Sequence, residues 1–241
     1  MMKYLLTILI IGVAFLSYGQ TLTDIHKRLK YLQSPRNFKH DTTGFSSMPK
    51  FDYFCDNENP NKSDYYHVVD VNEDGIKDLI YSGPCKPYGQ TRIFFNTGKD
   101  FKKAHSYPGE LVSIEKKSSL TIINILKNAC CCDYYSEYIQ ITIDSASNIR
   151  KNIIAFGADT KIKLNGRPKV VKVVGVLRTT PELNDITKKD SCRNQTLKGN
   201  HVTRIQKFTD IIQLNEVGPW WLVLYQQNQE RSWIGWMKMS K

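Results

Sequence analysis

The chain is 241 residues long and carries 34 lysine and arginine residues against 23 aspartate and glutamate residues, a formal net charge of +11. Hydrophobic residues make up 41% of it, and the length suits one large or two small domains, each able to bury a core. Beyond the N-terminus no apolar run reaches the roughly 20 residues that cross a bilayer, so we expect no membrane span.

The first 19 residues have the three parts of a secretory signal peptide. Lys3 supplies a short basic start, an apolar run extends from Tyr4 to Leu16, and Ser17 and Gly19 are small residues near the cleavage point. We therefore assign residues 1–19 to a signal peptide with cleavage near Gly19/Gln20, and we expect a periplasmic or secreted protein. Export argues against nucleic acid as the partner of the basic charge.

Charge divides the remaining chain into two parts. Residues 20–149 carry 16 basic and 16 acidic side chains, whereas residues 150–241 carry 17 basic and 7 acidic ones. A positive field of this kind attracts anionic partners, although a lysine-rich surface can also serve solubility alone. Residues 160–168 contain glycine and proline, so we predict that they form a linker. It separates a predicted first domain at 20–159 from a predicted second domain at 169–241.

The first domain begins with a predicted helix, because Leu22, Ile25, Leu29 and Leu32 recur at steps of three and four residues. A polar loop from Ser34 to Asp64 follows. Strand-like runs then dominate, namely HVVDV, DLIYS, TRIFF, LTIINIL, EYIQITI and NIIAF. The sequence therefore predicts a mainly β fold with an antiparallel β-rich first domain that holds one helix.

The segment DVNEDGIKD places oxygen-bearing side chains at every second position around Gly75. Calcium prefers six to eight oxygen ligands, and a tight loop supplies carboxylates together with a backbone carbonyl. The predicted calcium ligands are Asp70, Asn72, Asp74, the carbonyl of Ile76, and Asp78. The alternative is a polar hairpin turn that holds no metal, since Asp, Asn and Gly also favour turns.

The strands predicted on both sides of this loop, and Tyr81 where an EF-hand needs glutamate, argue against an EF-hand. From Asp64 to Phe101 the chain instead resembles a single VCBS or FG-GAP unit, a β-hairpin repeat built around DxNxDGxxD. No second DxNxDG is present, and the chain is too short for a seven-bladed propeller of such units. The resemblance implies one isolated unit with a structural calcium ion.

Six cysteines remain after the signal peptide, and export permits disulfides between them. They are Cys55, Cys85, Cys130, Cys131, Cys132 and Cys192. Fifteen pairings are possible, and the sequence does not choose among them. A soft metal at the cysteine triplet is the alternative, but its spacing is unlike that of zinc sites and no histidine lies nearby.

The second domain contains GVLRTTPELND, WWLVLY and SWIGWM, which resemble the opening, middle and closing strands of a bacterial Src-homology-3 domain. The resemblance runs from Lys169 to Lys241 and implies a small SH3-like β-barrel. A long insertion, Asn184 to Asn200, and the doubled tryptophan depart from the family pattern. Domains of this family attach exported proteins to cell-wall peptides or to other proteins, so the resemblance implies such a partner here.

Side chains alternate along a strand, so Trp220 and Trp221 should point to opposite faces of WWLVLY. We expect Trp221 and Trp236 in the core and Trp220 and Trp233 partly exposed, while the alternative places all four tryptophans in the core. Exposed aromatic rings beside cationic side chains could bind a peptide carboxylate with its apolar stem. The predicted ligand-binding residues are Trp220, Trp233, Tyr225, Arg178 and Arg231.

No catalytic motif is recognisable: the five histidines are scattered, and no GxSxG, HExxH or phosphate-binding glycine loop is present. The sequence predicts a non-enzymatic binding protein, stabilised by calcium and disulfides, that docks on cell-wall peptide, an anionic envelope polymer or an envelope protein. The alternative is an inhibitor or immunity protein acting on a secreted toxin or wall hydrolase, with the loop from Ser34 to Asp64 as its plug. An unrecognised hydrolase is the third possibility.

Overall fold

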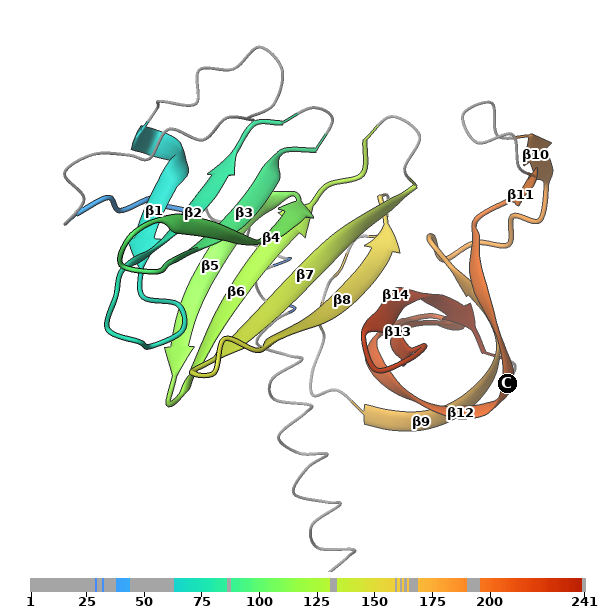
Figure 1. Cartoon of the computed structure of the whole chain (residues 1–241). Helices are drawn as coiled ribbons and strands as arrows, with labels where there is room; N and C mark the ends of the chain where they lie inside the picture. Colours follow the sequence, from blue (N-terminus) through green and yellow to red (C-terminus); the bar gives the residue numbers. More distant parts are fainter. Residues whose placement is uncertain are drawn as a thin grey trace, which may run out of the picture.

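The structure is a computed structural model that describes residues 29, 32, 38–43, 63–85, 88–130, 134–158, 160, 162, 164, 169–189 and 196–239. Over these residues the protein is mainly β, as predicted, with strands grouped in antiparallel arrays (Figure 1). Within the same residues, no helix has the length and apolar character needed to cross a membrane.

A four-stranded antiparallel sheet forms one layer of the N-terminal part. After the short 3-10 helix η1 (Ser63–Tyr65), its strands follow in the order β1 (Tyr66–Val69), β2 (Asp78–Gly83), β3 (Gln90–Asn96) and β4 (Phe101–Pro108). The second layer is an antiparallel meander of β5 (Glu110–Lys117), β6 (Leu120–Lys127), β7 (Tyr135–Asp144) and β8 (Ile149–Gly157).

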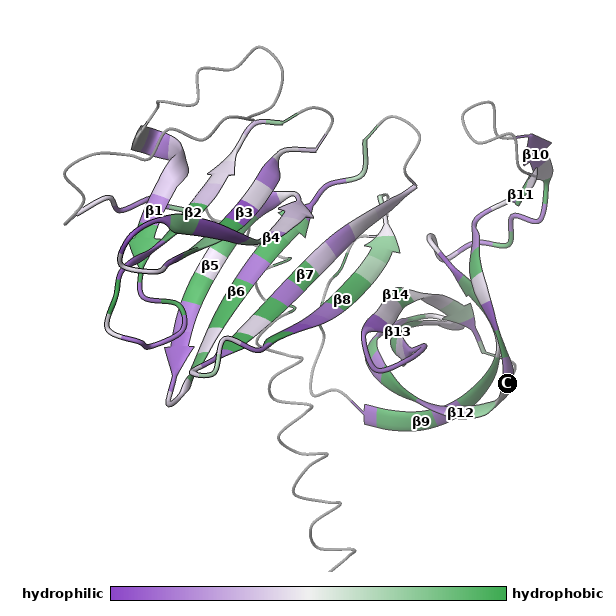
Figure 2. Cartoon of the chain, viewed as in Figure 1, coloured by the Kyte–Doolittle hydropathy of each residue, from purple (hydrophilic) through white to green (hydrophobic). Residues whose placement is uncertain are grey.

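The two layers pack face to face because alternate residues of their strands are apolar. Ile123 and Ile125 of β6 lie opposite Ile141 and Ile139 of β7, and all four side chains are buried. They share one core with Ile80 and Ile93 of the first sheet. The alternation is visible as green and purple bands along β6 and β7 (Figure 2). The N-terminal part is therefore a β-sandwich in which β6 and β7 direct alternate isoleucines into the core between the layers.

The C-terminal part is a closed ring of four strands, β9 (Lys169–Arg178), β12 (His201–Val217), β13 (Trp220–Gln226) and β14 (Arg231–Lys238). Strand β12 pairs with β9 and β13, and β14 pairs with β13 and, through Trp236 and Arg178, with β9. Val173, Leu177, Ile205, Val223 and Met237 belong to the core cluster of this ring. Its likeness to a Src-homology-3 barrel stays a prediction.

A separate hairpin of β10 (Thr187–Lys189) and β11 (Thr196–Lys198) is inserted between β9 and β12. It forms a two-stranded sheet of its own and projects away from the ring (Figure 1). This hairpin lies within the insertion that the sequence indicated between Asn184 and Asn200.

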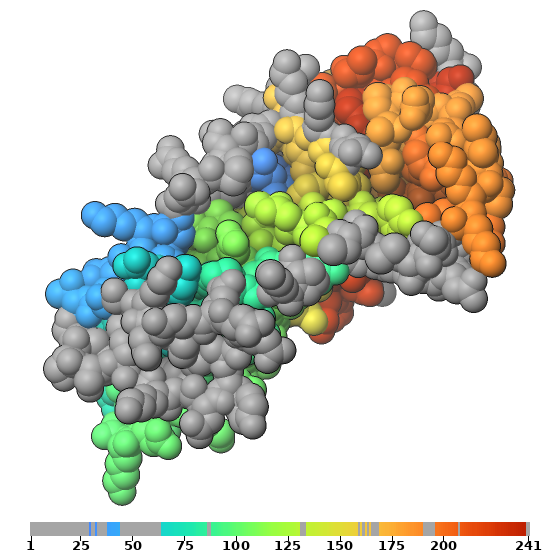
Figure 3. Space-filling view, turned by 90° about the horizontal axis from the view of Figure 1, so that it is seen from above, coloured from blue at the N-terminus to red at the C-terminus, as the bar shows by residue number. Residues whose placement is uncertain are grey.

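The sandwich and the ring share a sheet and a core. Strand β14 pairs in parallel with β8, so one eight-stranded sheet runs in the order β13-β12-β9-β14-β8-β7-β6-β5. Tyr138 and Ile154 of the sandwich join Trp220, Leu222 and other ring residues in a common hydrophobic cluster. In Figure 3 the yellow residues of β8 lie between the green sandwich and the orange and red ring.

The predicted helix and linker fall largely outside the described residues. Leu29 and Leu32 have helical conformation, and Leu29 is fully buried in the cluster that joins the two parts. From the predicted linker, Ile162 and Leu164 pack against the same cluster. The domain boundaries stay a prediction, but the two parts are joined by more than the linker.

Candidate functional site

The predicted calcium loop connects β1 and β2, and Asp78 forms its base. The buried Asp78 carboxylate accepts hydrogen bonds from the backbone N–H of Val71 at 2.9 Å and of Asn96 at 2.8 Å. One side chain thereby connects the start of the loop to the end of β3. Without an acceptor at Asp78, the inward-pointing N–H groups of Val71 and Asn96 would lack hydrogen-bond partners.

The other predicted ligands shape the turn. Asp70 accepts a hydrogen bond from the N–H of Gly75 at 3.0 Å, and Asp74 accepts one from the N–H of Ile76 at 2.8 Å. Gly75 has a φ of +85°, a conformation that glycine adopts without strain. The amide of Asn72 donates to Asp74 at 2.9 Å and to Ser147 of the β7–β8 turn at 3.1 Å. The loop is therefore tied to the opposite layer of the sandwich.

The electrostatics of the loop favour a cation. Burial, assisted by the charges of Asp74 and Asp70, raises the pKa of Asp78 to about 6, although its two backbone hydrogen bonds act in the opposite direction. One oxygen of Asp70 is buried without a hydrogen-bond partner. Among the described residues, however, no group of three or more His, Cys, Asp or Glu side chains is arranged to hold a metal ion. Calcium therefore stays a prediction that would also need Asn72 and a backbone carbonyl.

The cysteines are only partly described. Cys85 follows β2 and is disulfide-bonded, and the half-buried Cys130 follows β6. Cys55, Cys131, Cys132 and Cys192 lie outside the described residues. The pairing of the disulfides is therefore not assigned.

The predicted burial of the tryptophan pair is wrong. Trp220 is 9% exposed and lies in the core shared by sandwich and ring, whereas Trp221 is half-buried. The alternation itself is as expected, because Trp220 and Trp221 pack in different clusters. Trp220 is buried because β7 and β8 cover the ring face that it occupies. The predictions that Trp236 is buried and Trp233 half-buried are confirmed.

Three of the five predicted ligand-binding residues lie together at the joint of the two parts. Tyr225 and Trp233 are cross-strand neighbours, and the guanidinium of Arg231 lies 4.8 Å from the centre of the Trp233 ring. The same guanidinium donates to Glu137 of β7 at 2.7 Å, and Tyr135 packs edge-on against Trp233. A cationic and aromatic surface is thus present, but its cation already pairs with a carboxylate.

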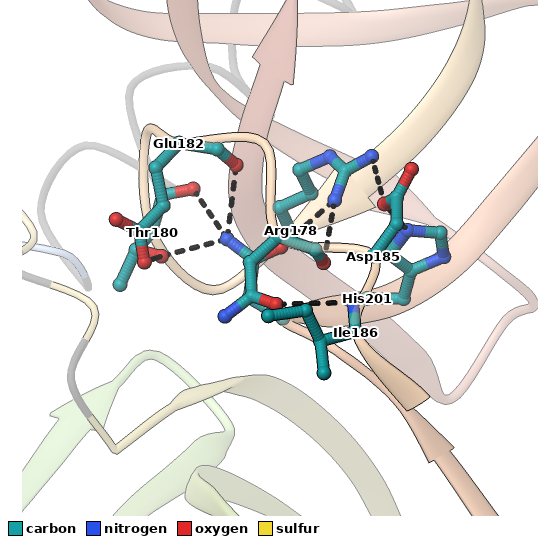
Figure 4. Close-up of polar contacts among 8 residues, drawn as sticks. Arg178, Thr180, Glu182, Asp185, Ile186 and His201 are labelled. Carbon is teal, nitrogen blue, oxygen red and sulfur yellow. Dashed lines mark hydrogen bonds and ion pairs between the residues drawn. The ribbon is translucent and has the colours of Figure 1, made fainter. Parts of the chain in front are cut away.

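Arg178 lies elsewhere, in a polar network at the base of the β10–β11 hairpin (Figure 4). Its side chain is 6% exposed and forms an ion pair with Asp185 at 2.8 Å. It also donates to the carbonyl of Asn184 at 3.2 Å and to the side chain of Asn200 at 2.8 Å. His201 lies 2.6 Å from the same oxygen of Asp185.

Asn200 completes this network from the other side of the hairpin. Its amide donates to the hydroxyl of Thr180 at 2.7 Å and to the carbonyl of Glu182 at 3.1 Å. Its backbone N–H donates to the carbonyl of Asn184 at 3.2 Å. The residues that enter and leave the hairpin are therefore held together, and the hairpin is anchored to the end of β9.

Beyond this anchor the hairpin exposes a basic surface that sequence reasoning missed. Lys188, Lys189 and Lys198 are exposed, and the six strand residues of the hairpin include no carboxylate. Lys198 lies opposite Thr187, so Lys189 and Lys198 share one face of this small sheet and Lys188 lies on the other. We call β10 and β11 the basic arm. The signal in the sequence is TKK and TLK on either side of a polar turn, within the segment of excess positive charge.

The loop proposed as an inhibitory plug, Ser34 to Asp64, lies mostly outside the described residues, and residues 38–43 and 63–64 are the part of it that the structure describes. No protein-family model matches the chain, and no curated protein or solved structure shows significant similarity to it. Its function is accordingly argued from the site geometry.

Proposed function

We propose that the protein is an exported, non-enzymatic binding protein that docks on an anionic polymer of the cell envelope through its basic arm. Its sandwich, supported by disulfides and a calcium ion in the β1–β2 loop, would carry the ring and the arm. The SH3-like reading of the ring is part of this proposal, and cell-wall peptide or an envelope protein are the other partners considered.

The observation that carries the proposal is the basic arm itself. Lys188, Lys189 and Lys198 are exposed on a hairpin whose two strands hold no carboxylate. This hairpin stands apart from the ring (Figure 1). Clustered exposed cations create a field that attracts polyanions and increases the rate of encounter. A protruding hairpin can contact a polymer without a preformed concave site.

The anchoring of the arm supports the same reading. A lysine pair on a freely moving loop loses conformational entropy when it binds, and that loss reduces affinity. Here Arg178, Asp185, Asn200 and His201 connect both ends of the hairpin to the ring. The lysines are therefore presented from a framework that is already ordered at its base.

Binding to purified sacculi, wall polymers and envelope extracts tests the proposal. We expect the protein to sediment with an anionic wall polymer at low salt and to be released at high salt, because salt screens exposed charges. The variant Lys188→Gln/Lys189→Gln/Lys198→Gln should bind at least about tenfold more weakly, since each cation near an anionic surface contributes on the order of 1 kcal/mol.

The matched control is Lys102→Gln/Lys103→Gln/Lys116→Gln, which removes three exposed lysines from the sandwich. Both variants lower the net charge by the same amount, so a specific role of the arm predicts a loss in the first variant alone. An equal loss of affinity in the two variants would show that net charge, and not the arm, governs the interaction. No binding to any polymer, with retention of an envelope protein, would replace the polymer by a protein partner.

A further inference from the structure

The base of the basic arm exposes two large apolar side chains. Leu183 and Ile186, in the segment that leads from β9 to β10, are 61% and 67% exposed. Among the described residues only Phe208, at 75%, exposes a larger fraction of a large apolar side chain. Neither Leu183 nor Ile186 belongs to a hydrophobic cluster of the described residues. A single exposed apolar residue is ordinary, but two beside a group of lysines form a mixed surface typical of an interaction site.

Hydrogen bonds hold the backbone of Ile186 in this exposed position. Its N–H donates to the side-chain oxygen of Asn184 at 3.2 Å (Figure 4). Its carbonyl accepts from the N–H of Gly199 at 2.8 Å. The carbonyl of Asn184 in turn accepts from Arg178 and from the backbone of Asn200. The network that anchors the basic arm therefore also fixes the place of this isoleucine.

The register of the hairpin places apolar and cationic side chains on one face. Lys188 lies opposite Leu197, and the bond between Gly199 and Ile186 continues the same antiparallel ladder. Because side chains alternate along a strand, Ile186, Lys188 and the half-buried Leu197 share this face. The basic arm is therefore amphipathic, and its lysines lie around its apolar side chains.

The charge around the apolar pair is positive. Two carboxylates lie at the base of the basic arm, Glu182 and Asp185, and Asp185 forms an ion pair with the buried Arg178 at 2.8 Å. In the sequence, residues 190–195 between the two strands contain one aspartate and one arginine. The three exposed lysines of the arm therefore outweigh the exposed carboxylate of Glu182, and the complementary partner is anionic.

A hydrophilic polyanion would contact the lysines but would leave Leu183 and Ile186 in water. The surface of an anionic bilayer engages both kinds of side chain. Its head groups attract lysines, and the boundary between head groups and acyl chains accepts apolar side chains. The hairpin projects from the ring, so it can reach such a surface without a groove (Figure 1).

We infer that the basic arm docks on an anionic lipid surface. Leu183 and Ile186 enter the interface, while Lys188, Lys189 and Lys198 contact the anionic head groups. The inference rests on the proposed function for the role of the lysines, and it adds a lipid bilayer to the polymer as a partner of the same arm. The apolar pair is the part of the arm that distinguishes the two partners.

Flotation of the protein with vesicles of equal amounts of phosphatidylglycerol and phosphatidylcholine tests the inference. We expect wild type to float with these vesicles and not with phosphatidylcholine alone. Leu183→Ser/Ile186→Ser should bind the anionic vesicles about tenfold more weakly, because two apolar side chains no longer leave water, and should bind the wall polymer unchanged. The matched control Leu120→Ser/Val217→Ser alters two apolar side chains exposed beside other turns and should change neither affinity.

A second readout keeps the apolar character of the arm. In Ile186→Trp, lipids brominated on their acyl chains should quench the added tryptophan fluorescence when the vesicles are anionic. Val217→Trp, at the other end of β12 from the arm, should show no quenching beyond that of wild type.

The two ligands separate this inference from the proposed function. Binding to the polymer without binding to anionic vesicles would overturn the inference alone, and binding to the vesicles without binding to the polymer would support it and overturn the polymer as partner. Equal vesicle affinity in the two double variants would show that the apolar pair takes no part. An equal loss on vesicles and polymer, or no quenching in Ile186→Trp, would overturn the inference as well.

Discussion

At the scale of single residues, Asp185 determines how the basic arm is held. Its Oδ1 accepts from Arg178 of β9 and contacts Nε2 of His201 at the start of β12 (Figure 4). The hydrogen bond to His201, followed by that to Arg178, lowers the pKa of Asp185. The folded protein therefore stabilises the ionised carboxylate of Asp185 relative to its protonated form.

We predict that Asp185→Asn destabilises the protein at neutral pH and that this effect disappears in acid. Because the folded pKa is lowered, the unfolded chain binds more protons between that pKa and the usual value of about 3.9. The stability that Asp185 contributes is complete above that usual value and is lost as the pH falls through the lowered one. Urea unfolding of wild type and variant over a series of pH values from neutral into the acid range measures this difference.

The matched control for this prediction is Asp210→Asn, which removes an exposed carboxylate from the middle of β12. It should shift the urea midpoint little at either pH. A difference between wild type and Asp185→Asn that stays constant from neutral pH to acid would contradict the role assigned to the ionised carboxylate.

The backbone conformation at Gly109 requires a glycine. It connects β4 of one layer to β5 of the other with a φ of +106°, and an added Cβ would lie 2.6 Å from the carbonyl oxygen of Leu126. We predict that Gly109→Ala lowers the free energy of unfolding by about 2–4 kcal/mol, from backbone strain together with overpacking. Denaturant unfolding measures the change.

Gly218→Ala is the control for that prediction. Gly218 also has a positive φ, +57°, but an added Cβ would meet nothing within 4 Å. It should cost about 1 kcal/mol from backbone strain alone. Equal costs at the two positions would show that the contact with Leu126 is relieved by a small backbone shift.

At the scale of elements, the β1–β2 loop concentrates three aspartates and Asn72 around one turn. Asp78 supports the turn from below, while Asp70 and Asp74 shape it through backbone hydrogen bonds. Burial, assisted by the charges of Asp74 and Asp70, raises the pKa of Asp78, and a bound cation would balance the repulsion among these carboxylates. The loop is also connected to the β7–β8 turn through Ser147, so its stability affects both layers.

We predict that calcium raises the melting temperature of the wild-type protein and not that of Asp74→Ala. A ligand that binds the native state at a hundredfold excess over its Kd stabilises it by about 2.7 kcal/mol. Thermal melts with calcium and with chelator measure the effect, and Asp210→Ala serves as a control with the same loss of charge. Identical melts with and without calcium in the wild type would reduce the loop to a polar turn.

The elements also show where sequence reasoning succeeds and where it stops. The β-branched and aromatic runs LTIINIL and WWLVLY predict strands, and the alternation of side chains along a strand correctly separates Trp220 from Trp221. It does not predict which tryptophan is buried, because that depends on β7 and β8 covering the ring. Arg178 and His201 come from different strands, so their meeting at one oxygen of Asp185 has no local pattern in the sequence.

At the scale of the whole molecule, the sandwich and the ring are structurally coupled. Two features connect them: the parallel pairing of β8 with β14, and a shared hydrophobic cluster that contains Tyr138, Ile154, Trp220 and Trp236. The sequence had indicated two separate domains, from the difference in charge and from a linker tract. A parallel pair between distant strands leaves no local signature, which is why sequence reasoning did not predict it. The basic arm is consequently carried by one large body.

We predict that the two parts unfold in a single transition. All four tryptophans lie between residues 220 and 236, so their fluorescence reports the ring, whereas far-ultraviolet circular dichroism reports all strands. The two signals should coincide in wild type. Trp220→Ala should lower the free energy of unfolding by about 3–5 kcal/mol, and Val217→Ala, at an exposed position, by less than about 0.5 kcal/mol.

Loss of the fluorescence signal at a lower denaturant concentration than the dichroism signal would contradict the coupling. The shared cluster would then be a contact between two independent domains. In that case the predicted linker at 160–168 would be the main connection between them.

The measurement that tests the central claim most directly is the affinity for an anionic wall polymer as a function of salt, for wild type and for the two triple-lysine variants. The account predicts strong binding at low salt, a steep decline as salt rises, and a loss confined to Lys188→Gln/Lys189→Gln/Lys198→Gln. Binding that is insensitive to salt, or equally reduced in Lys102→Gln/Lys103→Gln/Lys116→Gln, would contradict docking through the basic arm.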